Sequence, residues 1–69
     1  MTLRELRLHS LLKQEEVAKK LNVDQSAVSN WENGKANPLR KYRKKLAKLY
    51  GVTEDALETA IGGAPDVGV

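Results

Sequence analysis

The sequence has no cysteine, and no apolar run within its 69 residues is long enough to cross a bilayer. Without cysteine, the chain can form neither a disulfide nor a thiolate metal site. A membrane-spanning helix needs about 20 consecutive apolar residues, so a membrane partner is not expected. The first residues, MTLREL, also lack the apolar core of a secretory signal. We therefore expect a cytoplasmic domain (bacterial, or from a phage or mobile element and associated with the nucleoid) whose core is held by packing alone.

The sequence also lacks a recognisable set of catalytic or metal-binding residues. His9 is the single histidine, and it has no acidic or cysteine neighbour at metal-ligand spacing. No Ser/His/Asp set, Gly-rich phosphate loop or pair of catalytic carboxylates can be recognised. A chain of this length has little room for a substrate cleft in its core. We predict that it is not an enzyme and that it binds no cofactor, metal ion or small molecule.

Acidic residues are missing from one part of the chain. None occurs between Lys35 and Lys48, where basic residues are frequent, whereas no basic residue follows Tyr50. The net charge of the chain is +3. A local basic block of this kind indicates a polyanionic partner, although taken alone it also fits a solvated helix face.

Local signals divide the chain into helices. Thr2 and Glu5 have the spacing of a capping box. Asn22, Gly34 and Gly51 are residue types that tolerate the left-handed conformation at a helix end. Asp24 and Thr53 are good N-caps. These signals predict an all-α fold with five helices, at residues 3–9, 14–21, 25–33, from about Pro38 to Tyr50, and from Thr53 to Ile61.

Residues 1–61 are predicted to form one domain, and residues 62–69 a flexible C-terminal tail, because GGAPDVGV offers little to pack. In the fourth helix, the expected inward stripe is Leu39, Tyr42, Leu46 and Leu49.

The third helix is expected to have two different faces. It follows the second helix after about three residues, a tight turn that outlines a helix-turn-helix. At the helical period, its uncharged polar residues fall within an arc of about 140°, opposite its apolar residues. Amide and hydroxyl side chains can bond to base edges in the major groove of DNA, although a polar surface helix is the alternative. The polar residues are Gln25, Ser26, Ser29, Asn30 and Asn33, and the apolar ones are Ala27, Val28 and Trp31.

The run QEEVAKKLNVDQSAVSNWENGKANP resembles the helix-turn-helix of the Cro/CI-type (Xre family) regulators. The resemblance implies a compact five-helix bundle of the lambda-repressor-like DNA-binding type, with the helix-turn-helix formed by helices 2 and 3. It further implies sequence-specific binding to double-stranded DNA. By this resemblance we expect a transcriptional regulator, a repressor that acts as a homodimer on a palindromic operator.

The resemblance also implies roles for individual residues. Arg7 and Glu32 match a structural pair that ties the first helix to the end of the third. Gln14 resembles a residue that binds a phosphate and braces the first residue of the recognition helix. The expected base-contacting residues are Gln25, Ser26, Ser29 and Asn30. The expected phosphate-contacting residues are Gln14, Asn33 and Lys35, to which position at the start of the fourth helix adds Arg40 and Lys41.

The chain departs from the family pattern at two positions. Leu11 stands where many relatives have glycine, so that either the turn takes another shape or Leu11 fills a gap. Arg43 stands where many relatives bury a leucine. An alternative function is a protein-interaction module or an antitoxin-type partner, using Leu8, Leu11 and the fifth helix.

Overall fold

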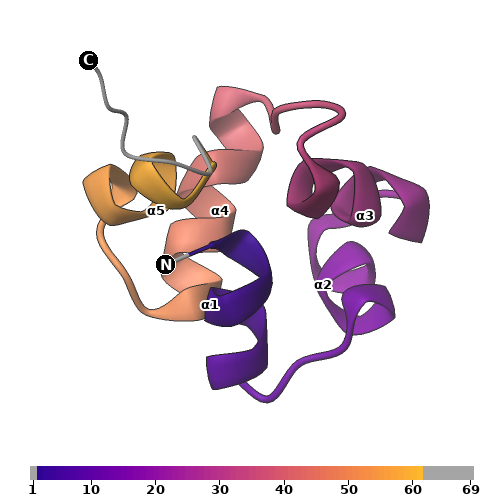
Figure 1. Ribbon diagram of the computed structural model, residues 1–69. Helices are drawn as coiled ribbons and strands as arrows, with labels where there is room; N and C mark the ends of the chain where they lie inside the picture. Colours follow the sequence, from indigo (N-terminus) through magenta and orange to yellow (C-terminus); the bar gives the residue numbers. More distant parts are fainter. Residues whose placement is uncertain (1, 62–69) are drawn as a thin grey trace.

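Five α-helices make up the part of the chain that the computed structural model describes, residues 2–61. There is no strand within these residues, so the prediction of an all-α fold is confirmed. The expected C-terminal tail, residues 62–69, lies outside the described residues. The helices are α1 (Leu3–His9), α2 (Gln14–Leu21), α3 (Gln25–Asn33), α4 (Arg40–Tyr50) and α5 (Glu54–Ile61) (Figure 1).

The helix ends follow the local signals of the sequence. Thr2 and Glu5 form the expected capping box, in which the Thr2 amide donates to Glu5 Oε1 at 2.7 Å and the Glu5 amide donates to Thr2 Oγ1 at 3.2 Å. Asn22 and Gly51 end α2 and α4 in the left-handed conformation. The Ala56 amide donates to Thr53 Oγ1 at 3.0 Å, which caps α5. Asp24 precedes α3 with an extended backbone, but its side chain makes no capping bond.

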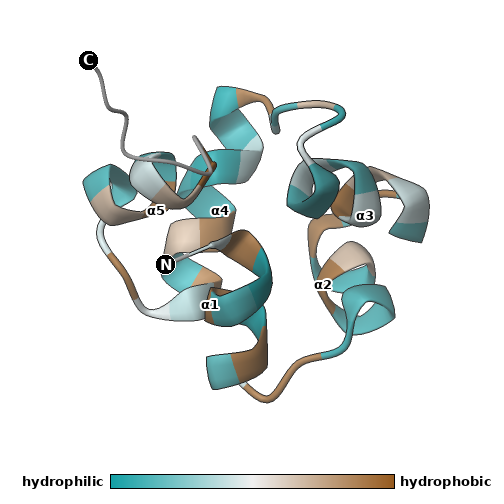
Figure 2. Ribbon diagram, in the orientation of Figure 1, coloured by the Kyte–Doolittle hydropathy of each residue, from teal (hydrophilic) through white to brown (hydrophobic). Residues whose placement is uncertain are grey.

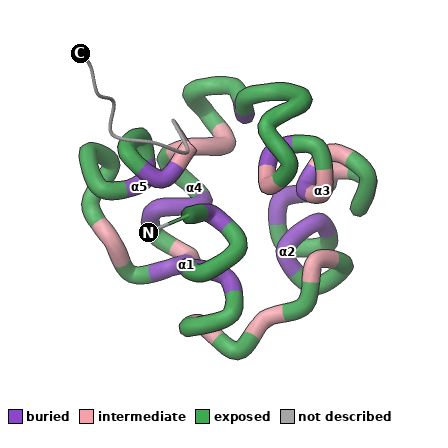
Figure 3. The backbone as a smooth tube through the Cα atoms, in the orientation of Figure 1, coloured by how far each residue is buried: buried purple, intermediate pink, exposed green. Residues whose placement is uncertain are grey.

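One apolar core joins all five helices. Figure 3 shows the buried segments turned toward the centre of the molecule. The largest side chains that are almost fully buried come from α2, α3, α4 and α5, so no helix pair forms a core of its own. The core consists of Leu3, Leu6, Val17, Ala18, Leu21, Val28, Trp31, Leu46, Ala47, Tyr50, Leu57 and Ala60.

The helices fall into two closely packed pairs. α2 packs against α3 across a short turn, and α4 packs against α5, with α1 touching α3, α4 and α5 (Figure 1). The α2–α3 pair has the short connection of a helix-turn-helix. Among residues 2–61, nothing covers the outer side of α3, where Gln25, Ser26 and Asn30 are exposed.

Leu39 does not belong to the inward stripe of the fourth helix. It is 63% exposed, while the buried residues of α4 are Leu46, Ala47 and Tyr50. The expectation for Leu39 was wrong because the helix begins only at Arg40. Leu39 is the N-cap residue, with extended backbone angles, so the helical period does not set the direction of its side chain.

Leu11 meets neither of the two expectations for the turn between α1 and α2. Its φ of 59° lies in the left-handed region, and its side chain is 89% exposed. The turn therefore keeps a conformation that suits glycine, and the leucine fills no gap. For a residue with a Cβ atom this conformation costs roughly 1 to 2 kcal/mol.

Within residues 2–61, no helix is both long enough and apolar enough to cross a membrane.

Candidate nucleic-acid interface

The α3 helix separates apolar from polar side chains as the sequence predicts. Val28 and Trp31 are buried against the core, and Ala27 is half-buried. Among the polar residues, Gln25, Ser26, Asn30 and Asn33 are exposed, whereas Ser29 is half-buried. Asn33 Nδ2 donates a hydrogen bond to Ser29 Oγ at 3.3 Å. The outer face of α3 therefore presents amides and hydroxyls without a charged group among them.

A buried ion pair fastens this helix to α1. Arg7 Nε donates to Glu32 Oε2 at 2.6 Å, and Arg7 Nη2 donates to Glu32 Oε1 at 3.3 Å. The two side chains are only 10% and 5% exposed. Arg7 Nη1 also donates to the carbonyl oxygen of Leu12 at 3.0 Å, which ties down the turn before α2. The hydrogen bonds to Glu32 raise the pKa of Arg7 above its ordinary value, so the guanidinium stays charged.

Gln14 extends the ion pair toward the exposed face of α3. Its Nε2 donates to Glu32 Oε1 at 2.9 Å, and its Oε1 accepts from Gln25 Nε2 at 3.4 Å. Four side chains from α1, α2 and α3 thus form one continuous chain of hydrogen bonds. The buried charge of Glu32 fixes the orientation of the Gln14 amide, and Gln14 in turn orients Gln25.

Tyr50 adds an aromatic neighbour to the buried pair. Burial, together with the nearby Glu32 charge, raises the pKa of Tyr50 to about 12. The tyrosine is therefore neutral at physiological pH and brings no second negative charge close to Glu32.

The basic residues proposed for the phosphate backbone lie around the connection from α3 to α4. Gly34 ends α3 with a φ of 77°, and the Lys35 amide donates back to the Asn30 carbonyl at 2.9 Å. Lys35, Arg40 and Lys41 are all exposed. Figure 2 shows hydrophilic residues over the first turn of α4, at the top of the view. Four backbone amides at a helix start lack intrahelical partners, which favours a nearby anion.

Lys41 makes a cation–π contact that the sequence did not reveal. Its Nζ lies 5.0 Å from the centroid of the Tyr42 ring, and that ring lies 5.7 Å from the ring of Trp31. The contact between Tyr42 and Trp31 joins α4 to α3, so the sequence of α4 alone gives no signal for it. The hydrogen bond from Arg7 to the Leu12 carbonyl and the one from Gln14 to Glu32 likewise depend on tertiary packing.

Arg43 is half-buried, and its Nε atom is buried without a hydrogen-bond partner among the described residues. It lies on the inner side of α4 rather than with Arg40 and Lys41. No group of three potential metal ligands occurs within residues 2–61.

Comparison with known proteins identifies the family. A profile described as helix-turn-helix matches residues 3–57, which is most of the chain. The chain belongs to the Cro/CI-type (Xre) helix-turn-helix family. It is 40% identical over 55 residues to the HTH-type transcriptional activator BcrR of Enterococcus faecalis. That match covers 80% of this chain and 27% of the relative. No solved structure matches significantly.

Family membership gives the two central helices their names. α2 is the first helix of the helix-turn-helix, and α3 is its recognition helix. The chain is a DNA-binding domain of the class found in transcription regulators. The hydrogen bonds from Arg7 and Gln14 to Glu32 therefore join the recognition helix to α1 and α2.

Proposed function

We propose that the chain binds a specific sequence of double-stranded DNA and regulates transcription by placing α3 in the major groove. One observation carries the proposal above all others. The uncharged outer face of α3 begins with Gln25, whose amide is tied through Gln14 to a buried ion pair. A helix face that only meets water does not need its amides held in one direction, whereas an amide that reads a base does.

The base-contacting residues of this proposal are Gln25, Ser26, Ser29 and Asn30, as the sequence suggested. Gln25 uses one N–H on Gln14, so its second N–H and its Oε1 remain for DNA. One donor beside one acceptor matches N7 and the N6 amino group of adenine. Gln25 is exposed at the first turn of α3, the part of a recognition helix that reaches deepest.

Phosphate contacts are assigned to residues on both sides of α3. Gln14 lies at the first turn of α2, and Asn33 and Lys35 lie at the end of α3. Arg40 and Lys41 lie at the start of α4. Each phosphate neutralised contributes a slope of about −0.9 to log affinity against log salt. Three cationic residues per chain predict a slope of about −3 for one copy and of about −5 to −6 for two.

The proposed assembly on DNA is a homodimer on a palindromic operator. A single module of this size buries only about 600 to 1,000 Å² on DNA, which limits its affinity. Two copies on half-sites one helical turn apart double the contacts. Bound over a promoter, such a dimer represses by blocking RNA polymerase. Activation from an upstream site is the second candidate, because the relative BcrR is an activator by name.

An unbiased selection of bound oligonucleotides is the decisive experiment. The proposal expects an inverted repeat with adenine at the base read by Gln25, together with a steep salt dependence. A reporter gene with the selected site placed over or upstream of the promoter then separates repression from activation. Negligible binding to any duplex at low salt would refute DNA binding. It would favour the protein-interaction or antitoxin-type role, for which Leu8 and Leu11 are 52% and 89% exposed.

A further inference from the structure

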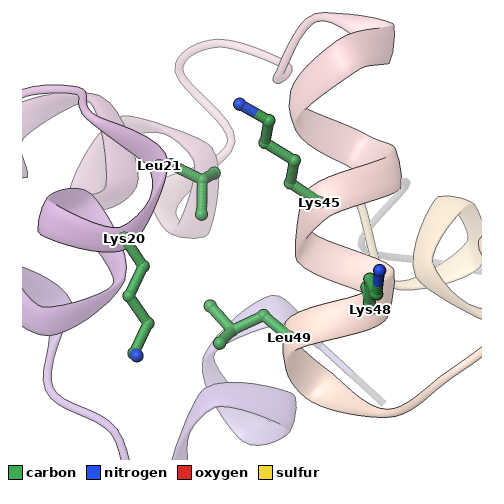
Figure 4. Close-up of a pocket in the computed structure, with 5 residues that line it drawn as sticks. All are labelled: Lys20, Leu21, Lys45, Lys48 and Leu49. Atoms are coloured by element: carbon green, nitrogen blue, oxygen red, sulfur yellow. The ribbon is translucent and has the colours of Figure 1, made fainter.

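A shallow groove between α2 and α4 combines an apolar floor with a cationic rim. It has a volume of about 240 Å³ and is lined by Lys20, Leu21, Lys45, Lys48 and Leu49. Figure 4 shows Lys20 and Leu21 on the α2 side and the other three residues on the α4 side. Leu21 is 3% exposed and Leu49 is half-buried, so the leucines form a recessed floor. The three lysines are exposed.

The lysines of this groove form no ion pair with any residue that the structure describes. Among residues 2–61, the only ion pair joins Arg7 to Glu32. Three like charges are therefore gathered around apolar side chains, with no carboxylate among the lining residues. Such an arrangement complements a ligand that carries negative charges on both sides of an apolar surface.

The groove lies further along α2 and α4 than the residues assigned to DNA. Lys20 follows Gln14 by six positions on α2, which places it about 9 Å further along the helix and about 120° around it. On α4, Lys45, Lys48 and Leu49 share one face through their spacing of three and four residues. They follow the first turn, where Arg40 and Lys41 lie.

We propose that this groove is a docking site for an acidic amphipathic helix of a partner protein. Walls formed by two helices, with an apolar floor between them, suit a helix that inserts its apolar side chains at a spacing of three and four residues. The carboxylates beside those side chains would then pair with Lys20, Lys45 and Lys48. The volume lies below the roughly 300 to 1,000 Å³ of small-molecule pockets, which favours inserted side chains over a small ligand.

Two other polyanions fit the groove less well. A phosphate backbone would pair with the lysines but would leave the leucine floor facing water. An anionic membrane would need protruding apolar side chains to enter it, whereas Leu21 is buried. Only a ligand with both acidic and apolar groups uses both parts of the groove.

A labelled peptide tests the proposal directly. The probe is an alanine-based helix of about 18 residues, long enough to be helical alone, with leucines along one face and glutamates beside them. Its binding to the whole chain is followed by fluorescence anisotropy at low salt, and the contact surface is mapped from backbone amide shifts in NMR spectra. We expect binding, with the largest shifts at Leu21, Lys45 and Leu49. Replacing the peptide leucines by alanine should weaken binding about tenfold.

Matched double variants separate the groove from general charge attraction. Lys20→Gln with Lys48→Gln should weaken peptide binding about fivefold. Lys19→Gln with Lys44→Gln removes the same charge from the same two helices outside the groove lining, and it should change binding less than twofold. Equal losses in the two variants would overturn the proposal. So would equal binding of the leucine-free peptide, or stronger binding to phosphatidylglycerol vesicles than to the peptide. DNA affinity, measured on the same preparations, should fall equally in both variants.

Discussion

The two helix pairs are held in the fold by different kinds of interaction. Within residues 2–61, every side-chain hydrogen bond that joins separate elements lies among α1, the turn after it, α2 and α3. The α4–α5 pair packs through apolar groups, of which Leu46 and Leu57 are almost fully buried. Apolar packing fixes where a helix lies, but it is non-directional. Hydrogen bonds also fix the direction in which an amide points, and this is what a base-reading face requires.

The largest expected effect is the loss of the buried charge in α3. Glu32→Gln leaves the Arg7 guanidinium buried without its counter-charge, which typically costs about 3 to 5 kcal/mol. Urea unfolding, followed by circular dichroism in the presence of sucrose to keep the variant folded, should show a loss of this size. A loss below about 1 kcal/mol would mean that the pair contributes no more than a surface ion pair does.

A double replacement separates stability from orientation. Arg7→Met with Glu32→Leu removes both charges, and such apolar replacements are often close to neutral in stability. Gln14 then loses its acceptor, so Gln25 is no longer held. We expect a folded domain that still binds DNA but discriminates less at the base read by Gln25. If its discrimination equalled that of the original chain, the directed hydrogen bonds would not be needed for reading.

The next effect contrasts base reading with backbone binding. Gln25→Ala should cost about 1 to 3 kcal/mol against the preferred site and relax preference at one base pair. Lys35→Ala should weaken all sequences alike and lower the salt slope by about 1 per copy. Titration of matched and single-mismatch duplexes over a salt series measures both quantities. A uniform loss from both substitutions would remove Gln25 from the base-reading residues.

Alkaline pH tests Tyr50, a core residue of α4 that lies near the Arg7–Glu32 pair. Because the pKa of Tyr50 is raised from 10.0 to about 12, the folded state holds the phenolic proton more tightly than the unfolded state does. The contribution of Tyr50 to the free energy of unfolding is fully present below pH 10 and is lost as pH rises toward 12. We expect the free energy of unfolding to fall by about 1 to 2 kcal/mol over this range. Tyr50→Phe has no phenol to ionise, so a smaller fall in this variant isolates the contribution of Tyr50.

The comparison also shows which parts of the fold the sequence could predict. The ends at Asn22, Gly34 and Gly51 were predictable because a left-handed conformation is a local preference of these residue types. The start of α3 followed from another local signal, Asp24 as a favoured N-cap residue. Side chains that meet across helices were not predictable from spacing, as the Gln14–Glu32 bond and the Trp31–Tyr42 contact show. The family pattern alone pointed to Arg7 and Glu32.

Leu11 escaped prediction because its local preference opposes the conformation that it adopts. Its φ of 59° is unfavourable for leucine, and the exposed side chain regains little by packing. Leu11→Gly should therefore stabilise the domain by a few tenths to about 1 kcal/mol, the relief of strain exceeding the entropy that glycine loses on folding. Leu8→Gly is the matched control, since Leu8 is also exposed but lies within α1, where glycine costs about 1 kcal/mol. Opposite signs in thermal unfolding would show that the turn before the recognition unit stores strain. A loss of stability in both variants would show that the fold accommodates Leu11 without cost.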